Sequence, residues 1–488
     1  MRRRAAVASA LLGGLLAAGL AAAQPAAPSA PTECRIAGLR HAVLCGKVSR
    51  PLDPARPDGT RIDVHYVVVP ALARRKFADP VFLLAGGPGQ SAIDLAPSVM
   101  PLFGRLNNRR DMVFVDQRGT GRSAPLDCGD PRGEPLAEQA DPARQSARLF
   151  DCLARLQRLP HGDLRKYTTS IAVQDLDAVR AALGAAQVNL IGASYGTRVA
   201  LEYQRQFPAA VRRSVLDGVA PPDMDLVASL AVDSRRALEA VFTACEADAG
   251  CRSRYPALRA DWQALLASLP REVTVDHPLT GAPERVILTR TMLLGIVRGP
   301  LYAPALAAAL PAAMAAAAKG DFRGLMGAGS LLPSRRGSRL AMGMHLSVVC
   351  AEDRASIDRA PVPGAATDGD GADALYREIC SAWPRGDVSA GFYRIGVTST
   401  PVLLLSGGLD PATPPRHAER VANALGGRAR HVVVPNAGHG VMGLACLRDA
   451  IFRFIDAADE ADALAVDTGC AQTLPRPPAF RPIEGVAP

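Results

Sequence analysis

The sequence predicts an α/β fold in which a mostly parallel sheet, covered by helices on both faces, is interrupted by a long helical insertion. Short apolar runs alternate with helix-patterned segments over residues 61–219, and again over residues 401–440. Such alternation indicates a parallel sheet. Between these stretches, from about residue 225 to residue 396, the chain is rich in alanine and leucine and has helical runs instead.

Each strand of the first part is predicted from an apolar run bounded by turn residues. These runs are "RIDVHYVVVP" (61–70), "VFLLAGG" (81–87), "MVFVD" (112–116), "VNLIG" (188–192) and "RSVLDGV" (213–219). Helical spacing of apolar residues predicts helices at "SIAVQDLDAVRAALG" (170–184) and "TRVALEYQRQF" (197–207), the second stopped by Pro208. The order of strands and helices is that of a sheet wound on both faces.

The second part repeats the alternation after the insertion. Strand–helix–strand order is expected from "TPVLLLSGG" (400–408), "HAERVANALGG" (417–427) and "RHVVVPNAGHG" (430–440). Within the insertion only "ERVILTR" (284–290) has a strand pattern. We therefore expect a core made of residues 24–224 and 397–488, with residues 225–396 as a mostly helical cap.

The first 23 residues have the pattern of an export signal. A basic start, "MRRR", precedes an apolar run of small residues, and Ala21 to Ala23 fit an A-x-A cleavage site before Gln24. The alternative is an uncleaved membrane anchor, although the run is barely long enough to span a bilayer. The pattern favours cleavage and export to the periplasm or the medium, by the general or the twin-arginine route.

The ten cysteines fall into five couples that are close in sequence. In an oxidising compartment an even number at such spacings predicts disulfides. The spacing favours the pairs Cys34–Cys45, Cys128–Cys152, Cys245–Cys251, Cys350–Cys380 and Cys446–Cys470, although other connectivities remain open. Metal binding is the weaker alternative, because no C-x-x-C or cysteine–histidine spacing is present. We expect no metal and no organic cofactor.

The net charge of +9 includes three arginines of the expected signal, so the mature chain is less basic. The remaining excess is scattered in pairs such as Arg109–Arg110, and no basic block contains interleaved aromatic residues. This distribution argues against nucleic acid as a partner.

One serine lies where a strand is expected to become a helix. Gly192-Ala193-Ser194-Tyr195-Gly196 follows "VNLI" and precedes "TRVALEY". A nucleophile elbow needs this order, with the serine strained at positive φ and small residues two positions away on each side. The small residues keep strand and helix from colliding. The alternative is an ordinary turn with an incidental serine, but the context favours Ser194 as a nucleophile.

A serine nucleophile needs a histidine base. His439, in "VVVPNAGHG", follows a strand after the serine, and its loop is rich in glycine. The other histidines precede the serine, lie in the insertion, or sit at the start of a helix or strand: His41, His65, His161, His277, His345, His417 and His431. Elimination therefore favours His439 as the base.

The histidine in turn needs a carboxylate that orients it. Asp410 lies just past a predicted strand end, in the unit next to that of His439. Asp217, also at a strand end, and Asp353, in the insertion, are the alternatives. The adjacency of the two loops favours Asp410.

Acyl transfer also needs hydrogen-bond donors for the oxyanion. The Tyr195 N–H, next to the nucleophile, is one expected donor. The glycine-rich loop "LLAGGPGQS" supplies Gly86 and Gly87, where the backbone can approach a substrate closely. A plain turn is the alternative for this loop.

Together these elements resemble the α/β-hydrolase serine peptidases, in the branch of prolyl iminopeptidases and tripeptidyl aminopeptidases. The resemblance rests on "GGPGQS" (86–91), "DQRGTGRS" (116–123), "DLDAVRAALG" (175–184), "GASYGT" (192–197), "LDGV" (216–219), "SGGLDPATP" (406–414) and "NAGHG" (436–440). It spans most of the chain outside the insertion. One departure is Ala85, because relatives often have a histidine immediately before the glycine loop.

The resemblance implies an α/β-hydrolase fold with Ser194 as nucleophile, His439 as base and then acid, and Asp410 as the orienting residue. It also implies that the insertion covers the site and that acidic cap residues hold the free amino terminus of a peptide substrate. Glu352 and Asp353, in "VVCAEDR", are the residues it suggests for this role. A solvated acidic turn is the alternative for each.

The combined expectation is an exported serine exopeptidase that removes short N-terminal pieces from peptides through an acyl-enzyme. The same triad acting on esters or small amides is an alternative, because the triad does not define the leaving group. A non-catalytic binding protein is a third, disfavoured because Ser194, Asp410 and His439 are all present. The sequence indicates neither the oligomeric state nor how many residues are removed.

Overall fold

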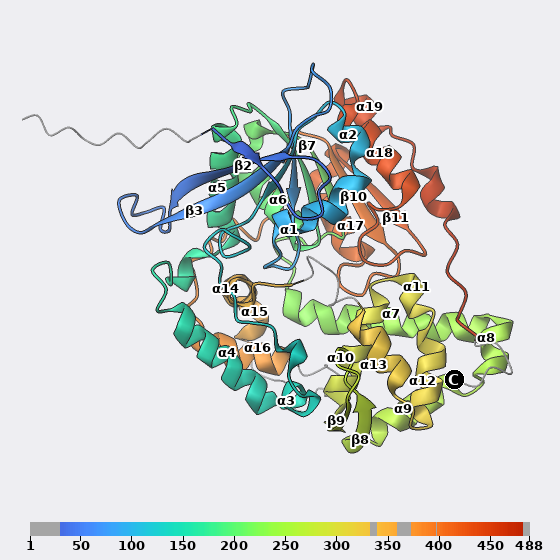
Figure 1. Cartoon of the computed structure of the whole chain (residues 1–488). Helices are drawn as coiled ribbons and strands as arrows, with labels where there is room; N and C mark the ends of the chain where they lie inside the picture. The colour runs from blue at the N-terminus through green and yellow to red at the C-terminus, as the bar shows by residue number, and fades with distance from the viewer. Residues whose placement is uncertain (1–29, 332–338, 359–371, 397, 482–488) are drawn as a thin grey trace, which may run out of the picture.

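The computed structural model describes residues 30–331, 339–358, 372–396 and 398–481, so the expected signal at residues 1–23 lies outside the described residues. Within these ranges one large sheet forms the centre of the upper half of the molecule in Figure 1, and the cap helices lie below it. Its strands are β1 (Thr32–Cys34), β2 (Val43–Pro51), β3 (Arg61–Val69), β4 (Val81–Leu84), β5 (Met112–Val115), β6 (Val188–Ala193), β7 (Val211–Asp217), β10 (Val402–Gly407) and β11 (Ala429–Val434).

The strand order is β1-β2-β3-β5-β4-β6-β7-β10-β11. The strands from β5 to β11 in this order pair in parallel, whereas β1, β2 and β3 pair antiparallel and join the sheet through β5. Every residue of β4, β5 and β10 is buried, as is typical of parallel strands covered on both faces. The carboxyl ends of β4, β6, β7, β10 and β11 therefore meet at one edge of the sheet.

Helices cover both faces of this sheet, and the predicted fold class is confirmed. One face packs against α5 (Thr169–Ala182), α6 (Tyr195–Gln206) and α17 (Pro415–Leu425). The other packs against α1 (Ala92–Val99), α2 (Gly104–Asn107), α18 (Ala445–Asp456) and α19 (Glu460–Leu464). Two separate apolar clusters, one on each side of the sheet, make up the core.

The segment between β7 and β10 is mostly helical, and its first part has an apolar cluster of its own. Its elements are α7 (Leu226–Ala247), α8 (Ala249–Arg254), α9 (Leu258–Ala267), β8 (Arg271–Asp276), β9 (Pro283–Leu288), α10 (Arg290–Leu301), α11 (Pro304–Ala307), α12 (Leu310–Ala318), α13 (Arg323–Ser330), α14 (Met342–Glu352), α15 (Arg354–Ile357) and α16 (Ala372–Ala382). The sequence predicted β9 but missed β8, its antiparallel partner.

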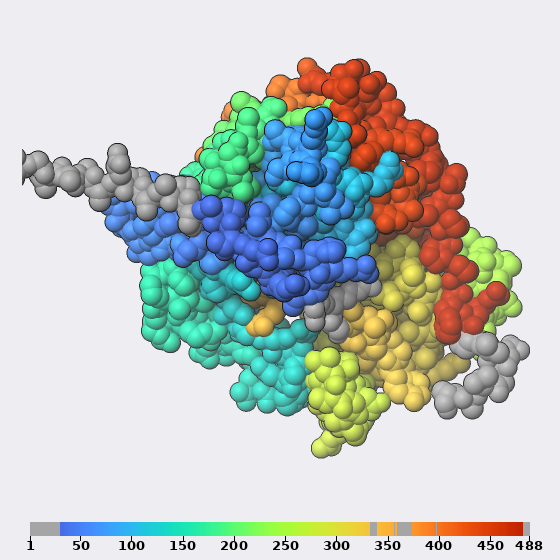
Figure 2. All heavy atoms as spheres, turned by 45° about the horizontal axis from the view of Figure 1, so that its top comes forward, coloured from blue at the N-terminus to red at the C-terminus, as the bar shows by residue number. Residues whose placement is uncertain are grey.

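The insertion has two differently packed parts. Helices α7 to α13 share the cap cluster, whereas residues of α14, α15 and α16 join the core cluster beneath the sheet. A second excursion, between β5 and α5, supplies α3 (Leu136–Ala140) and α4 (Pro142–Leu156). Figures 1 and 2 show this excursion beside β8 and β9, and α3 contacts β9. No pattern in the sequence predicted that residues before the serine would help to build the cap.

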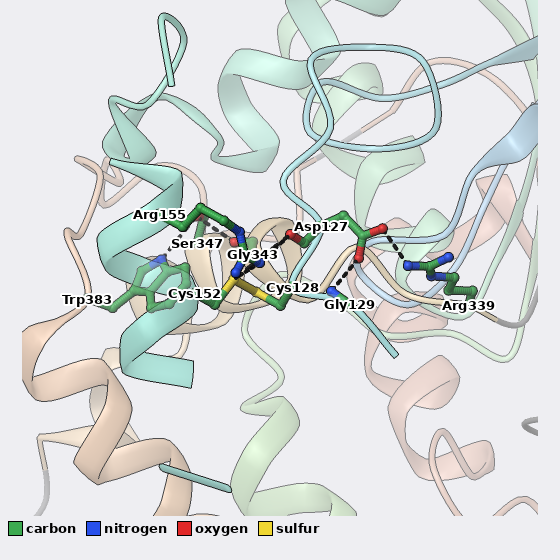
Figure 3. Close-up of a disulfide and its surroundings, with 9 residues drawn as sticks. All are labelled: Asp127, Cys128, Gly129, Cys152, Arg155, Arg339, Gly343, Ser347 and Trp383. Carbon is green, nitrogen blue, oxygen red and sulfur yellow. Dashed lines mark hydrogen bonds and ion pairs between the residues drawn. A yellow bond between two sulfur atoms is a disulfide. The ribbon is translucent and has the colours of Figure 1, made fainter. Parts of the chain in front are cut away.

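Five disulfides join the couples that the spacing favoured, and no free cysteine remains. The Cys128–Cys152 bond fastens the start of the excursion to α4 (Figure 3). Beside it, Asp127 pairs with Arg339, and Gly343 N–H donates to Leu126 O. The described residues contain no helix long and apolar enough to cross a membrane.

The turn from β6 to α6 depends on two glycines. A Cβ atom on Gly192 would lie 2.5 Å from Gly196 O, and one on Gly196 would lie 2.2 Å from Leu84 O. Both distances are far below van der Waals contact with rigid backbone. The expected reason for small residues at these positions, close approach of strand and helix, is therefore what the structure shows.

Replacing Gly196 by alanine is expected to destabilise the fold by about 1–3 kcal/mol, because the methyl group forces β4 and α6 apart. Urea unfolding followed by circular dichroism measures the change. Gly327, an exposed helical glycine in α13 with nothing within 4 Å of its Cβ position, is the matched control. Gly327→Ala should leave stability unchanged or raise it slightly. Equal stability of Gly196→Ala and the wild type would contradict the packing argument.

Candidate active site

Ser194 occupies the turn at the carboxyl end of β6. Its backbone has φ 55° and ψ −123°, a left-handed conformation that is strained for a residue with a side chain. The Ser194 N–H donates to Asp217 O at 2.9 Å, and Thr197 donates to Ser194 O from both its N–H and its hydroxyl. These three hydrogen bonds fix the backbone of the turn and hold Ser194 in its strained conformation.

His439 and Asp410 lie side by side after β11 and β10. His439 Nδ1 is 2.8 Å from Asp410 Oδ2. Since the carboxylate accepts, Nδ1 carries the proton and Nε2 remains as the basic nitrogen. Asp410 also accepts from the N–H groups of Ala412 and Thr413, each at 2.8 Å. The pair is therefore fixed in the orientation that a general base requires.

Burial and the neighbouring charge shift the pKa values of His439 and Asp410 in opposite directions. Burial alone would lower the pKa of His439, but the charge and hydrogen bond of Asp410 outweigh it and raise that pKa above its usual 6.5. Burial alone would raise the pKa of Asp410, but His439 and the backbone donors lower it. Each partner favours the charged form of the other, so the site stabilises an imidazolium when the histidine takes up a proton.

Thr413 is a further contact of the pair that sequence reasoning missed. Its hydroxyl donates to Asp410 Oδ2 at 2.9 Å and lies 3.1 Å from His439 Nδ1. Gly218 makes room for the ring, because a Cβ there would lie 3.2 Å from His439 Cε1. Residues of the loops after β7 and β10 thus surround the histidine.

Asp217, the alternative acid, has a different position. Its carboxylate accepts from Val441 N–H and Met442 N–H at 2.7–3.0 Å, and its main-chain carbonyl accepts from Ser194 N–H. Burial raises the pKa of Asp217 to about 6. The residue therefore fastens the loop that follows His439 to the turn that carries Ser194, while Asp410 contacts the imidazole.

The serine hydroxyl and the His439 ring share no hydrogen bond in the described part of the chain. The two residues belong to adjacent loops, joined through Asp217. In hydrolases without substrate such contacts are often long and tighten when the substrate binds.

The glycine-rich loop lies directly against Ser194. A Cβ on Gly86 would lie 3.3 Å from Ser194 Cβ, and Gly87 has φ +109°. Among the described residues the N–H groups of Gly86 and Gly87 donate no hydrogen bond to the protein. Tyr195 is the first residue of α6, whose first N–H groups have no acceptor within the helix. Among the described residues the three expected oxyanion donors therefore have no protein acceptor, and Gly86 lies against Ser194.

Cap residues contact both the His439 loop and the glycine-rich loop. Tyr302, after α10, accepts a hydrogen bond from His439 N–H at 2.9 Å, and its ring meets the imidazole edge-on at 5.0 Å. His345, in α14, lies 3.1 Å from Pro88 O through Nδ1 and 2.7 Å from the Tyr376 hydroxyl through Nε2. Burial lowers the pKa of His345, which favours its neutral form. No sequence pattern pointed to these contacts.

Glu352 and Asp353 differ from the open carboxylate pair that the resemblance suggested. Both are 3% exposed, and Arg198 Nη1 lies 3.3 Å from each carboxylate. Glu352 also accepts from the N–H and hydroxyl of Thr169, and Asp353 from Leu226 N–H. They therefore join α14 to α5, α6 and α7. Their role as an ammonium clamp stays a prediction.

The cluster around Arg198 has two carboxylates for one guanidinium. Burial raises the pKa of Asp353 to about 7 and also raises that of Glu352. Sequence reasoning missed Arg198 because it lies more than 150 positions from both acids.

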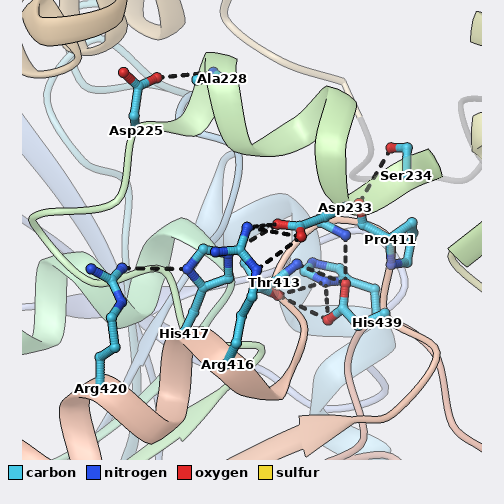
Figure 4. Close-up of polar contacts among 12 residues, drawn as sticks. Asp225, Ala228, Asp233, Ser234, Pro411, Thr413, Arg416, His417, Arg420 and His439 are labelled. Carbon is cyan, nitrogen blue, oxygen red and sulfur yellow. Dashed lines mark hydrogen bonds and ion pairs between the residues drawn. The ribbon is translucent and has the colours of Figure 1, made fainter. Parts of the chain in front are cut away.

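A second cluster ties the cap to the loop of Asp410 (Figure 4). Asp233 of α7 pairs with Arg416 at 2.8 Å and with His417 at 3.0 Å, both on α17. Ser234 donates to Pro411 O at 3.3 Å, one residue after Asp410. Among the described residues, no group of three or more histidine, cysteine, aspartate or glutamate side chains has an arrangement that can hold a metal ion.

Comparison with known proteins agrees with this fold. Residues 79–245 match the alpha/beta hydrolase fold family, and residues 370–465 match the TAP-like protein family. The chain therefore has an α/β-hydrolase fold, and its C-terminal part matches the TAP-like family. The resemblance predicted from the sequence motifs is thereby confirmed for the family and the fold.

The relatives of this chain include proteins named as peptidases. It is 33% identical over 202 residues to a tripeptidyl aminopeptidase of Streptomyces lividans, covering 38% of this chain and 37% of that protein. It is also 33% identical over 196 residues to the serine protease Hip1 of Mycobacterium tuberculosis, covering 37% of each chain. The matched part thus spans little more than a third of either relative.

A solved esterase from Rhodococcus sp. has 14% identity and a TM-score of 0.37, over 82% of this chain and 96% of that one. Because that superposition is loose, the fold assignment rests on the strand order and the family matches.

Replacing Asp217 by asparagine is expected to lower kcat for a reporter ester by at least about tenfold with little change in KM. The amide keeps one acceptor oxygen but puts an NH2 donor in place of the other, so a buried N–H group of the histidine loop faces a donor, at a cost of about 1–3 kcal/mol. Steady-state kinetics separates the two constants. Asp63→Asn, which removes an exposed pairing with Lys47, is the control and should leave both unchanged. A kcat within twofold of the wild type would show that Asp217 does not position the site.

Proposed function

We propose that this protein is an exported serine exopeptidase that cleaves short N-terminal pieces from peptides through an acyl-enzyme on Ser194. The observation that carries the proposal is the Asp410–His439 hydrogen bond, in the loops next to a serine held at positive φ. Backbone N–H groups at this serine and in the glycine-rich loop have no acceptor among the described residues. This arrangement supplies a nucleophile, an oriented base and an oxyanion site, the parts that acyl transfer needs.

In the proposed mechanism, His439 Nε2 takes the proton from Ser194 Oγ as this oxygen attacks the carbonyl carbon of the scissile bond. The negative charge that forms on the carbonyl oxygen is held by the N–H groups of Tyr195 and of Gly86 or Gly87. His439 then gives its proton to the leaving amine, and the C–N bond breaks. Water, deprotonated by His439, releases the acyl group and restores the serine.

The choice of peptides as substrates is supported by the relatives. The two relatives described above, each 33% identical over part of the chain, are named as a tripeptidyl aminopeptidase and a serine protease. Export is supported by the signal pattern of residues 1–23 and by the five disulfides, which are typical of oxidising compartments. Ester hydrolysis is the second candidate function, because a carboxylesterase B of Mycobacterium tuberculosis is 29% identical over 195 residues.

A panel of p-nitroanilides with one, two or three residues, each with a free or an acetylated amino terminus, tests the proposal. We expect turnover of the free-amine peptides, at least about tenfold less for the acetylated copies, and none with Ser194→Ala. Simple p-nitrophenyl esters complete the panel. Turnover of esters alone would contradict the peptidase proposal and favour the second candidate. No turnover of any substrate in the panel would contradict both candidate functions.

The activity is expected to rise with pH, with an apparent pKa above 6.5. His439 must be neutral to accept the serine proton, and Asp410 raises the pKa of His439 despite its burial. Profiles of kcat/KM between about pH 5 and pH 9 measure this value. Asp410→Asn removes the charge that raises the pKa and should lower kcat by about 10⁴. An unchanged profile in that variant would place the orienting acid elsewhere.

A further inference from the structure

The glycine-rich loop of residues 86–90, which carries the expected oxyanion donors, makes few hydrogen bonds of its own. Gly87 and Gly89 have φ of 109° and 107°, a region that glycine adopts readily and other residues rarely do. Among the described residues, the backbone hydrogen bond that closes within this loop runs from Gln90 N–H to Gly86 O and is long, at 3.4 Å. The loop therefore depends on neighbouring residues for a fixed conformation.

The segment that leads into α14 of the cap lies directly against this loop. Ala341 N–H donates to Gly89 O at 2.9 Å, and Leu340 forms an isolated antiparallel bridge with Gln90. The approach is close, because a Cβ on Gly89 would lie 2.9 Å from Ala341 O and one on Gly87 would lie 3.2 Å from Leu340 Cδ2. Cap backbone thus holds the second half of the loop.

The side chain of His345 reaches the first half of the loop from α14. Its Nδ1 lies 3.1 Å from Pro88 O, and because a carbonyl only accepts, Nδ1 carries the proton and donates. Its Nε2 lies 2.7 Å from the Tyr376 hydroxyl, which then donates to it. Burial lowers the pKa of His345 and so favours the neutral ring that both contacts need. Pro88 directly follows Gly87, so this contact lies one residue from an expected oxyanion donor.

The surroundings of this imidazole are fastened at several points. Tyr376 belongs to α16, and the Cys350–Cys380 disulfide joins α14 to α16. At the other end of the segment, Arg339 pairs with Asp127 at 2.6 Å (Figure 3). The ring is therefore held on a fixed part of the cap, and the cap can hold the loop through it.

We infer that His345 is a positioning residue: through Pro88 O, its Nδ1–H group holds the glycine-rich loop where the amide donors of the loop can bind the oxyanion. The inference rests on acyl transfer at Ser194, the chemistry of the proposed function. Such donors stabilise the transition state only when they lie within about 3 Å of the developing charge. A displacement of about 1 Å can lower the rate by about 10²-fold. A cap residue thereby affects the chemical step without touching the substrate.

Three variants separate the hydrogen bond to the loop from the volume of the ring. We expect His345→Leu to lower kcat by about 10–100-fold, with KM within about twofold, for the most rapidly cleaved p-nitroanilide of the panel above. His345→Asn keeps an N–H donor near the position of Nδ1 and should recover most of the lost kcat. Tyr376→Phe leaves the donor to Pro88 O in place and should have a smaller effect than His345→Leu.

A transition-state analogue gives a readout that a purely structural role would not change. A trifluoromethyl ketone with the same peptide forms a tetrahedral adduct with Ser194, and the oxygen of this adduct occupies the oxyanion position. Its Ki should therefore rise in His345→Leu by about the factor by which kcat/KM falls. The apparent pKa of the kcat/KM profile should stay that of the wild type, because the Asp410–His439 pair is unchanged.

Ser347→Ala is the matched control on the same helix. Ser347 is 1% exposed, and its hydroxyl joins Trp383 Nε1, at 3.1 Å, to Gly343 O rather than to the glycine-rich loop. The variant should lose about 1 kcal/mol of stability in urea unfolding, while kcat, KM and the Ki of the analogue stay within about twofold of the wild type.

The outcomes separate the inference from the proposed function. A kcat of His345→Leu within twofold of the wild type, or an unchanged Ki, would overturn the inference while leaving the peptidase intact. Equal losses of kcat in Ser347→Ala and His345→Leu would also overturn it, because the effect would then come from the stability of α14. A wild type that hydrolyses p-nitrophenyl esters but no p-nitroanilide would instead overturn the proposed function, and the same variants compared on the ester would still test His345.

Discussion

The geometry of the site depends on Asp217, the last residue of β7. Its main-chain carbonyl accepts from Ser194, and its carboxylate accepts from the two N–H groups that follow the His439 loop. One buried residue thus sets the distance between the strained serine and the histidine. The parallel sheet makes this possible, because β6, β7, β10 and β11 end at the same edge. The two carboxylates therefore have different roles: Asp217 holds the two loops together, and Asp410 orients the imidazole.

Much of the core could be predicted from the sequence because each strand and turn is marked by a pattern of residues that are close together in the chain. Apolar runs that end in glycine predicted the parallel strands, and the small residues around Ser194 predicted the turn to α6. The expectation that Asp410 and His439 would be neighbours needed only the order of strands, since adjacent parallel strands present their following loops side by side. The structure places these two residues in hydrogen-bond contact, and the five disulfides join cysteines that are close in sequence.

The cap and the contacts between cap and core could not be predicted, because they depend on residues far apart in the chain. Nothing local marks α3 and α4 as neighbours of an insertion that begins more than sixty residues later. Glu352 and Asp353 looked like an open acidic pair because Arg198, which binds both, lies in another part of the sequence. Strand β8 was missed although Val273 and Val275 alternate with polar residues, since a single exposed hairpin gives a short pattern.

In the proposed mechanism Ser194 forms a covalent acyl-enzyme with the N-terminal part of a peptide. Rapid acid quenching of the protein with an apolar tripeptidyl p-nitrophenyl ester, followed by digestion and mass spectrometry, tests this most directly. The fragment containing Ser194 is expected to gain the mass of the tripeptidyl group, and the adduct is expected to form more slowly in a variant lacking His439. An adduct on another residue, or substrate turnover with no adduct at any quench time, would contradict it.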